Sequence, residues 1–310
     1  RQEWWDLYKP GDIDMPKTVL TREAQDGFSQ RLMDGIEAST IEVTDDEIRN
    51  ARHAYYANTS YFDSKVGELV RTLEEAEMLD NTIVMVTADH GDMLGERGLW
   101  YKMNFFEHSA RVPLVMAGPG VANRTIPNAC SLVDVLPTML DIAARDGAEK
   151  PTLGQPTDGR SLFPLMSGGG GDTDEAIGEY CAEMTSHPVI MIRRGRYKYI
   201  HCDVDAPLLY DLEADPDELT SLADHPDHGE RAKAFADEIA ARWNSEKIRS
   251  DVIATQKARR AIYESMNRGN LTSWDFQPHR DAANEYVRNH MDWTVAAEKT
   301  RFPPLPKEDA

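Results

Sequence analysis

The residues with the clearest chemical potential stand directly after a short hydrophobic run. Asp89 and His90 follow residues 82–87, and Gly91 comes next. A carboxylate beside an imidazole offers a hard oxygen and a borderline nitrogen, which together suit a divalent cation. Asp and Gly are also common turn residues, so these three letters alone are equally compatible with an ordinary surface turn. The choice between a metal site and an ordinary turn therefore depends on the neighbouring residues.

Charged and aromatic side chains crowd the stretch that follows. The charged residues are Asp92, Glu96, Arg97 and Lys102, and the interleaved apolar residues are Leu99, Trp100, Tyr101, Phe105 and Phe106. Lys102 could place a compact positive charge against an anionic group bound at the metal, although an ordinary exposed lysine is the plain alternative. Glu107 and Arg111 could pair across the next turn, which indicates structural support rather than catalysis.

The elements that must position these residues follow an α/β rhythm. Thr44-Asp-Asp-Glu47 has the form of a capping box. The apolar residues behind it have the spacing of a long helix and are Ile48, Ala51, Tyr55, Phe62, Val66, Leu69 and Leu73. Residues 82–87 predict a central strand, residues 112–116 a second strand, and residues 132–144 a helix interrupted by Pro137. This order predicts an α/β fold whose site lies where strands end.

Composition changes near residue 150, before the glycine run 168–171, which predicts a flexible surface loop. Beyond it, strands are expected at 177–181, 189–193 and 197–201, the last two joined as a hairpin, and then a helix at about 230–243. We therefore expect three parts. Residues 1–165 would be the C-terminal part of a catalytic α/β domain, 172–250 a smaller α+β subdomain, and 251–310 a C-terminal extension.

Charge and composition exclude several classes of partner. Among 310 residues, 34 Lys and Arg face 54 Asp and Glu, a formal net charge of −20, which disfavours nucleic acid and anionic membranes. A solvated acidic surface is the simple interpretation, and an acidic pocket for a cationic substrate is the alternative. No apolar run approaches the roughly 18 residues of a spanning helix. Cys130, Cys181 and Cys202 are too dispersed for a disulfide framework, so we expect buried thiols and a cytoplasmic location.

Several separated segments resemble the type I sulfatases of the alkaline phosphatase superfamily. Residues 81–102 (NTIVMVTADHGDMLGERGLWYK) look like the C-terminal metal motif of that family, and residues 131–138 (SLVDVLPT) and 209–222 (LYDLEADPDELTSL) are also similar to it. Residues 273–278 (SWDFQP) and 286–292 (YVRNHMD) resemble the extension typical of choline sulfatases. The likeness implies a chain carrying part of an alkaline-phosphatase-like mixed sheet with helices on both faces, a smaller subdomain and an extended tail.

By this resemblance, Asp89 and His90 are ligands of one divalent metal ion, calcium or else Mg²⁺ or Mn²⁺, and Lys102 contacts the sulfate as a catalytic and substrate-binding residue. A quaternary ammonium has no proton to donate, so only carboxylates and aromatic faces can hold it. The similarity makes Glu183 and Asp292 candidates for that role, with Glu179 the close rival of Glu183. Trp274, Phe276 and Trp293 could supply aromatic faces or simply pack.

The sequence departs from the family at the nucleophile. Sulfatases use a formylglycine made from the first residue of Cys-x-Pro-x-Arg, and none of the three cysteines stands in that pattern. The resemblance therefore assigns the nucleophile and the remaining metal ligands to an N-terminal segment of the same protein. It also implies a homo-oligomer, dimer or tetramer, built through the tail. Asp292 could then act at a neighbouring subunit's site, or be an exposed acid at a helix end.

The expected reaction is hydrolysis of choline-O-sulfate to choline and sulfate. An aryl sulfatase, or a phosphonate or phosphate monoester hydrolase of the same superfamily, is the alternative within enzymes. A non-catalytic fragment that retains the scaffold is the alternative outside them.

Overall fold

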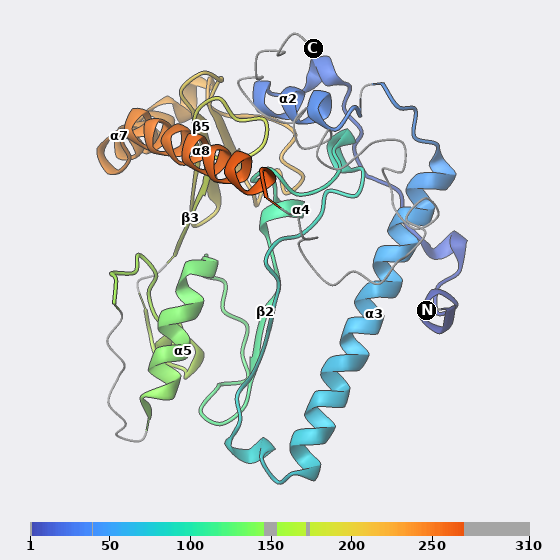
Figure 1. Ribbon diagram of the computed structural model, residues 1–310. Helices are drawn as coiled ribbons and strands as arrows, with labels where there is room; N and C mark the ends of the chain where they lie inside the picture. Colours follow the sequence, from blue (N-terminus) through green and yellow to red (C-terminus); the bar gives the residue numbers. More distant parts are fainter. Residues whose placement is uncertain (1, 39, 146–153, 172–173, 270–310) are drawn as a thin grey trace.

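The structure, a computed structural model, describes residues 2–38, 40–145, 154–171 and 174–269. The helices are α1 (Gln2–Trp5), α2 (Gly27–Gly35), α3 (Asp45–Glu75), α4 (Glu107–Ala110), α5 (Val135–Ala143), α6 (Phe163–Met166), α7 (Gly229–Arg242) and α8 (Ser245–Asn267). The strands are β1 (Val84–Thr87), β2 (Leu114–Ala117), β3 (Glu175–Tyr180), β4 (Val189–Arg194), β5 (Tyr197–Cys202) and β6 (Leu208–Asp211). Helices and sheets are mixed along the chain, as the predicted α/β class requires (Figure 1).

The long helix α3 begins where its capping box predicts. The Thr44 hydroxyl accepts from the backbone N–H of Glu47 at 3.3 Å, and the Glu47 carboxylate accepts from the backbone N–H of Thr44 at 2.8 Å. After α3, β1 pairs antiparallel with β2, with Thr87 opposite Leu114. In Figure 1 this two-stranded ribbon runs between α3 and α5. The end of β1 therefore delivers the turn that carries Asp89 and His90.

Four antiparallel strands form the second sheet, in the order β3-β4-β5-β6. The predicted β4–β5 hairpin is confirmed, with Arg194 opposite Tyr197 and Gly195 at a φ of +54° in the turn. Helix α7 covers one face of this sheet, where Phe235 stacks on Tyr199 with ring centroids 5.5 Å apart. The buried residues of this core are Ile190, Ile192, Tyr199, Leu209, Ala232, Phe235 and Ile239.

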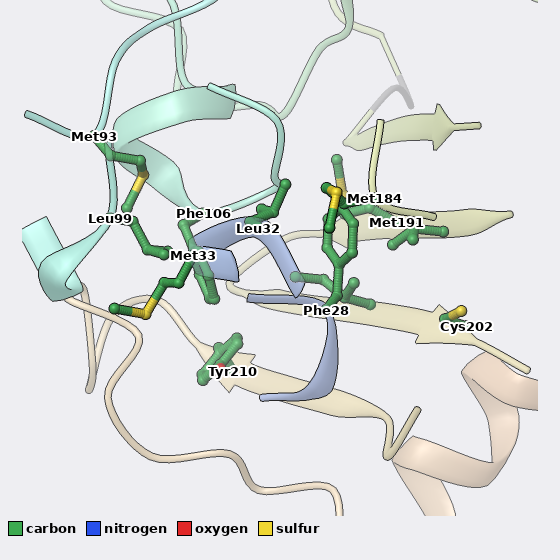
Figure 2. Close-up of a cluster of buried hydrophobic side chains, with 12 residues drawn as sticks. Phe28, Leu32, Met33, Met93, Leu99, Phe106, Met184, Met191, Cys202 and Tyr210 are labelled. Carbon is green, nitrogen blue, oxygen red and sulfur yellow. The ribbon is translucent and has the colours of Figure 1, made fainter. Parts of the chain in front are cut away.

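The opposite face of the sheet packs against α2 and the loop of residues 92–106 that follows β1. Figure 2 shows this second core. The loop contributes Met93, Leu99 and Phe106, α2 contributes Phe28, Leu32 and Met33, and the sheet contributes Val189, Met191, Ile200, Cys202 and Tyr210, with Met184 beside them. Each large apolar side chain buried here contributes about 1.5–3 kcal/mol. The loop bearing Lys102 is therefore anchored on the four-stranded sheet.

The three cysteines differ in their exposure to solvent. Cys202 is buried as expected, but the prediction was wrong for Cys130, which is exposed, and for Cys181, which is partly exposed. Cys130 lines an open cavity rather than a core, which explains its exposure. Among the described residues, no helix has the length and apolar character needed to cross a bilayer.

A bidentate ion pair fastens α2 to the loop between β5 and β6. The Arg31 guanidinium donates to the Asp205 carboxylate at 2.7 and 2.6 Å, and the Asp205 side chain is 9% exposed. Burial alone would raise the pKa of Asp205, but the hydrogen bonds and charge of Arg31 outweigh it and lower that pKa. Ionised Asp205 therefore stabilises the folded chain.

Asp205→Asn is expected to lower the free energy of unfolding by about 2 kcal/mol, less than a fully buried pair because Arg31 stays partly exposed. Since the folded pKa is depressed, the contribution is complete above the unfolded pKa of about 3.9 and is lost as pH falls through the folded pKa. Urea unfolding at pH 7 and at lower pH measures both effects. Asp237→Asn, which breaks the exposed pair with Lys233 on α7, should cost less than about 0.5 kcal/mol. Equal losses in the two variants would contradict the expectation.

Candidate active site

The turn after β1 presents Asp89 and His90 side by side. Asp89 Oδ2 lies 3.3 Å from His90 Nε2, and the Asp89 side chain is 86% exposed. His90 Nδ1 lies 2.8 Å from the Gly91 carbonyl oxygen. Because a carbonyl oxygen only accepts, this contact places a proton on Nδ1 and leaves Nε2 on the side of the Asp89 carboxylate. An imidazole nitrogen and a carboxylate oxygen therefore face the same space.

These two donors fit part of a divalent metal site. Carboxylate oxygen and imidazole nitrogen both coordinate divalent cations, and the Nδ1 contact is the kind that orients a metal-bound histidine. Within the described ranges, no cluster of three or more His, Cys, Asp or Glu side chains has the geometry to hold a metal. Asp92 is close in sequence, but it accepts from the Leu94 backbone N–H at 3.2 Å, and burial raises its pKa. Asp89 and His90 thus supply two ligands, and a complete site needs others.

Lys102 lies on the same cavity as Asp89 and His90. This cavity has a volume of about 1100 Å³. The Lys102 side chain is exposed, whereas its backbone carbonyl is fixed by the Asn104 backbone N–H at 2.8 Å and by the Ser109 hydroxyl. A flexible ammonium on a fixed backbone can reach an anion bound in the cavity. The structure therefore brings three predicted site residues onto one cavity, while their roles stay predictions.

One wall of the cavity is formed by β3 with Phe105 beside it, and it carries aromatic and acidic groups. Phe105, Tyr180 and Glu179 line it. Phe105 lies so close to β3 that a Cβ at Gly178 would stand 2.5 Å from its ring, so this position requires glycine. The Glu179 carboxylate accepts from the indole N–H of Trp243. The wall therefore offers aromatic faces, whereas its Glu179 carboxylate is engaged by Trp243.

Glu183 lies just beyond that wall and reaches it through Tyr180. The Tyr180 hydroxyl donates to the Glu183 carboxylate at 2.8 Å, and the Glu183 side chain is exposed. Burial, together with this bond to an anion, raises the pKa of Tyr180, so the phenol stays protonated. Asp292 and the tail aromatics Trp274, Phe276 and Trp293 lie outside the described residues.

Several charged residues on the cavity were not singled out as site residues by the sequence. Glu107, Arg193 and Lys198 line it, from α4, β4 and β5. Lys198 had one usable signal, because a lone lysine inside the apolar run Tyr197-Lys-Tyr-Ile200 is unusual for a buried strand. Nothing local indicated that Glu107 and Arg193 would meet it.

Models of three sulfatase families match this chain, two of them over overlapping residues. The model described as Sulfatase matches residues 19–144. The model of the N-sulphoglucosamine sulphohydrolase C-terminal region matches residues 95–245, and that of the choline sulfatase C-terminal region matches residues 250–302.

Individual proteins agree with these matches. The choline-sulfatase of Rhizobium meliloti (strain 1021) is 42% identical over 308 residues, which cover 98% of this chain and 59% of that protein. Arylsulfatase K of Mus musculus is 39% identical over 196 residues, or 59% of this chain and 34% of that protein. The crystal structure of the phosphonate monoester hydrolase of Agrobacterium radiobacter superposes with a TM-score of 0.65 at 25% identity, over 77% of this chain and 52% of that one. The chain thus spans about three fifths or less of the length of these relatives.

Proposed function

Because this chain belongs to the sulfatase family and contains the C-terminal region of choline sulfatases, we propose that it forms part of an enzyme that hydrolyses choline-O-sulfate to choline and sulfate. The observation that carries the proposal is that Asp89, His90 and Lys102 line one cavity. Two metal-type donors and one ammonium around a single space suit an anionic ester better than a neutral substrate.

Each residue has a defined task in this reaction. A divalent cation held by Asp89 and His90, most simply calcium, would polarise a sulfate oxygen when bound. Lys102 holds a second sulfate oxygen and places a fixed positive charge where negative charge develops as the ester S–O bond breaks. His90 keeps its proton on Nδ1 through the Gly91 carbonyl, so its other nitrogen stays directed at the cavity. The nucleophile, expected to be a formylglycine, would come from another segment.

The β3 wall suits the choline end of the substrate. A quaternary ammonium is held by aromatic faces and carboxylates, because it cannot donate a hydrogen bond. Phe105 and Tyr180 supply such faces in the cavity, and the Glu183 carboxylate places its negative charge beside the protonated Tyr180 hydroxyl. A net charge of −20 further favours the approach of a cation. Asp292 stays a candidate for the same role.

An N-terminal segment of the same protein would complete the site. Large apolar side chains are exposed on three elements around the β1–β2 ribbon: Tyr55, Phe62 and Leu69 of α3, Val115 of β2, and Leu136 and Met139 of α5. Exposed large apolar side chains and uncovered strand edges mark places where further polypeptide packs. The 59% coverage of the Rhizobium enzyme leaves room for such a segment. Oligomerisation through the tail stays a prediction, and of the tail the structure describes residues 251–269 alone.

A direct comparison of substrates tests this function. The full-length protein should hydrolyse choline-O-sulfate with a kcat/KM at least about 100-fold above that for 4-nitrophenyl sulfate or a phosphonate monoester, because only the choline ester engages the ammonium site. Steady-state kinetics with the three esters measures this. A preference for the aryl sulfate or the phosphonate ester would instead favour the activities named for Arylsulfatase K and the Agrobacterium hydrolase.

Glu183→Gln tests the proposed binding of the choline ammonium. It should raise KM for choline-O-sulfate about tenfold and leave the aryl ester unchanged, because removal of a nearby carboxylate weakens ammonium binding alone. Glu179→Gln is the matched variant, since Glu179 is already engaged by Trp243. A larger KM effect in Glu179→Gln would move the assignment to that residue.

A further inference from the structure

The short helix α4 contacts both halves of the candidate site. The Gly91 backbone N–H donates to the Ser109 carbonyl at 2.7 Å, and a Cβ at Gly91 would stand only 2.1 Å from the His108 carbonyl oxygen. The Ser109 hydroxyl donates to the Lys102 carbonyl. The turn of Asp89 and His90 and the backbone of Lys102 are therefore both fixed to α4, so the position of α4 sets their separation.

Helix α4 is itself held by a buried charge cluster that includes Lys198 of β5 and Glu218 of the segment after β6. The Lys198 ammonium lies 2.5 Å from Glu107 Oε1 and 2.9 Å from Glu218 Oε1, and it donates to the Phe105 carbonyl at 2.9 Å. The Glu107 backbone N–H donates to Glu218 Oε2 at 2.6 Å. Side chains of Lys198 and Glu218 are each 1% exposed. Glu107, Lys198 and Glu218 form what we call the buried charge cluster.

Arg193 lies 3.4 Å from Glu107 Oε2, so the buried charge cluster and Arg193 together hold two positive and two negative groups, each with a partner. Burial raises the pKa of both carboxyls, but Lys198 and Arg193 outweigh it for Glu107, whose pKa is lowered, whereas that of Glu218 stays raised. Glu218 also adopts a φ of +55°, which is costly for a residue with a side chain, and its carbonyl accepts from Arg97.

Stability alone is a poor explanation for this arrangement. Buried ion pairs are often replaceable by apolar side chains without loss of stability, because removing charges from water costs about as much as their attraction returns. What a fully satisfied charge cluster adds is one defined geometry. Here the cluster fixes the position of α4, and α4 in turn holds the backbones of Gly91 and Lys102.

We propose that Lys198 and Glu218 are positioning residues for the candidate active site: through Glu107 they hold α4, and through α4 they set the separation of His90 and Lys102. Neither residue is a catalytic residue in this proposal, since both act through α4. The inference deepens the proposed function and rests on it for its kinetic consequence, but its structural consequence can be measured without turnover.

Glu218→Gln in the full-length protein is the first test. It should lower kcat for choline-O-sulfate about 100-fold and leave KM within about threefold, because a displacement of roughly 1 Å in a reacting constellation costs that much in rate. Asp217→Asn is the matched control. Asp217 is the preceding residue, and its partner Lys17 is 67% exposed, so turnover should stay within about twofold of wild type.

The double variant Lys198→Met/Glu218→Gln guards against simple unfolding. It removes one positive and one negative charge together, and Glu107 keeps Arg193 as its partner. Hydrogen exchange provides the readout that does not depend on activity. Amides of residues 89–109 should exchange at least about tenfold faster in the variants, while those of β4 and β5 keep wild-type protection.

The outcomes separate the two proposals. If wild type hydrolyses no sulfate ester, the proposed function fails, and hydrogen exchange still decides the positioning role. A folded variant with wild-type turnover and wild-type exchange at 89–109 would overturn the inference. Global unfolding of both variants would assign the cluster to stability rather than positioning and would overturn it as well.

Discussion

Replacing His90 by alanine in the full-length protein is expected to lower the turnover of choline-O-sulfate about 1000-fold, because His90 in its proposed role as a metal ligand would supply several kcal/mol of transition-state stabilisation. Asp89→Asn should act similarly, since it removes the carboxylate beside Nε2. The melting temperature should hardly change. The His90 and Asp89 side chains are 35% and 86% exposed, so neither supports a core. Steady-state kinetics and thermal unfolding together measure both statements.

The control for this prediction is a second His–Asp pair elsewhere on the chain. His225 Nδ1 lies 4.0 Å from Asp227 Oδ2, and that aspartate is also 86% exposed. His225→Ala should therefore keep wild-type turnover. Calorimetric titration with calcium adds a measurement that is independent of turnover, and binding should be lost in His90→Ala and retained in His225→Ala. Turnover in His90→Ala within tenfold of wild type would remove His90 from the site.

Lys102→Met is expected to lower kcat about 100- to 1000-fold, because it removes one preorganised positive group that faces the developing charge. Methionine keeps the length of the apolar stem, and the Lys102 backbone stays bonded to Ser109 and Asn104, so the fold should be unaffected. Product inhibition by inorganic sulfate should weaken in parallel, which distinguishes a lost anion contact from a displaced loop. Kinetics with and without added sulfate measure this.

Lys233→Met, at a lysine that is 73% exposed on α7, is the matched control and should behave as wild type. If Lys102→Met lowered kcat but left sulfate inhibition intact, Lys102 would act on the chemical step without holding the sulfate. Unchanged kcat would make it the ordinary exposed lysine that its sequence context also allowed.

Local signals allowed much of the fold to be predicted from the sequence. The capping box placed the start of α3, and the β-branched run placed β1 at Val84–Thr87, two residues shorter than expected at its start. Helix α2 was missed although Asp26 caps it by accepting from the Ser29 backbone N–H at 3.0 Å. Strand β6 was missed because four residues leave too little alternation to detect.

Part of the candidate site was likewise predicted from the sequence, and part of it was missed. Asp89, His90 and Lys102 belong to one continuous segment, so their motif is visible in the sequence. The buried charge cluster joins residues 111 positions apart at Glu107 and Glu218, and no local pattern encodes that contact. The β3 wall is similarly invisible, because Phe105 meets Gly178 only after the sheet forms. Long-range pairing, rather than residue type, was the missing information.

The apolar core of Figure 2 contains four methionines, Met33, Met93, Met184 and Met191. Unbranched thioethers repack around altered neighbours, and exchanges between methionine and leucine usually cost less than about 1.5 kcal/mol. The loop of residues 92–106 can therefore accumulate substitutions on its packed side without losing its attachment. Its registration against the sheet is fixed separately, by charges that tolerate little exchange. An adaptable apolar contact combined with a fixed buried charge cluster would let the sequence of this loop vary while Lys102 keeps its position.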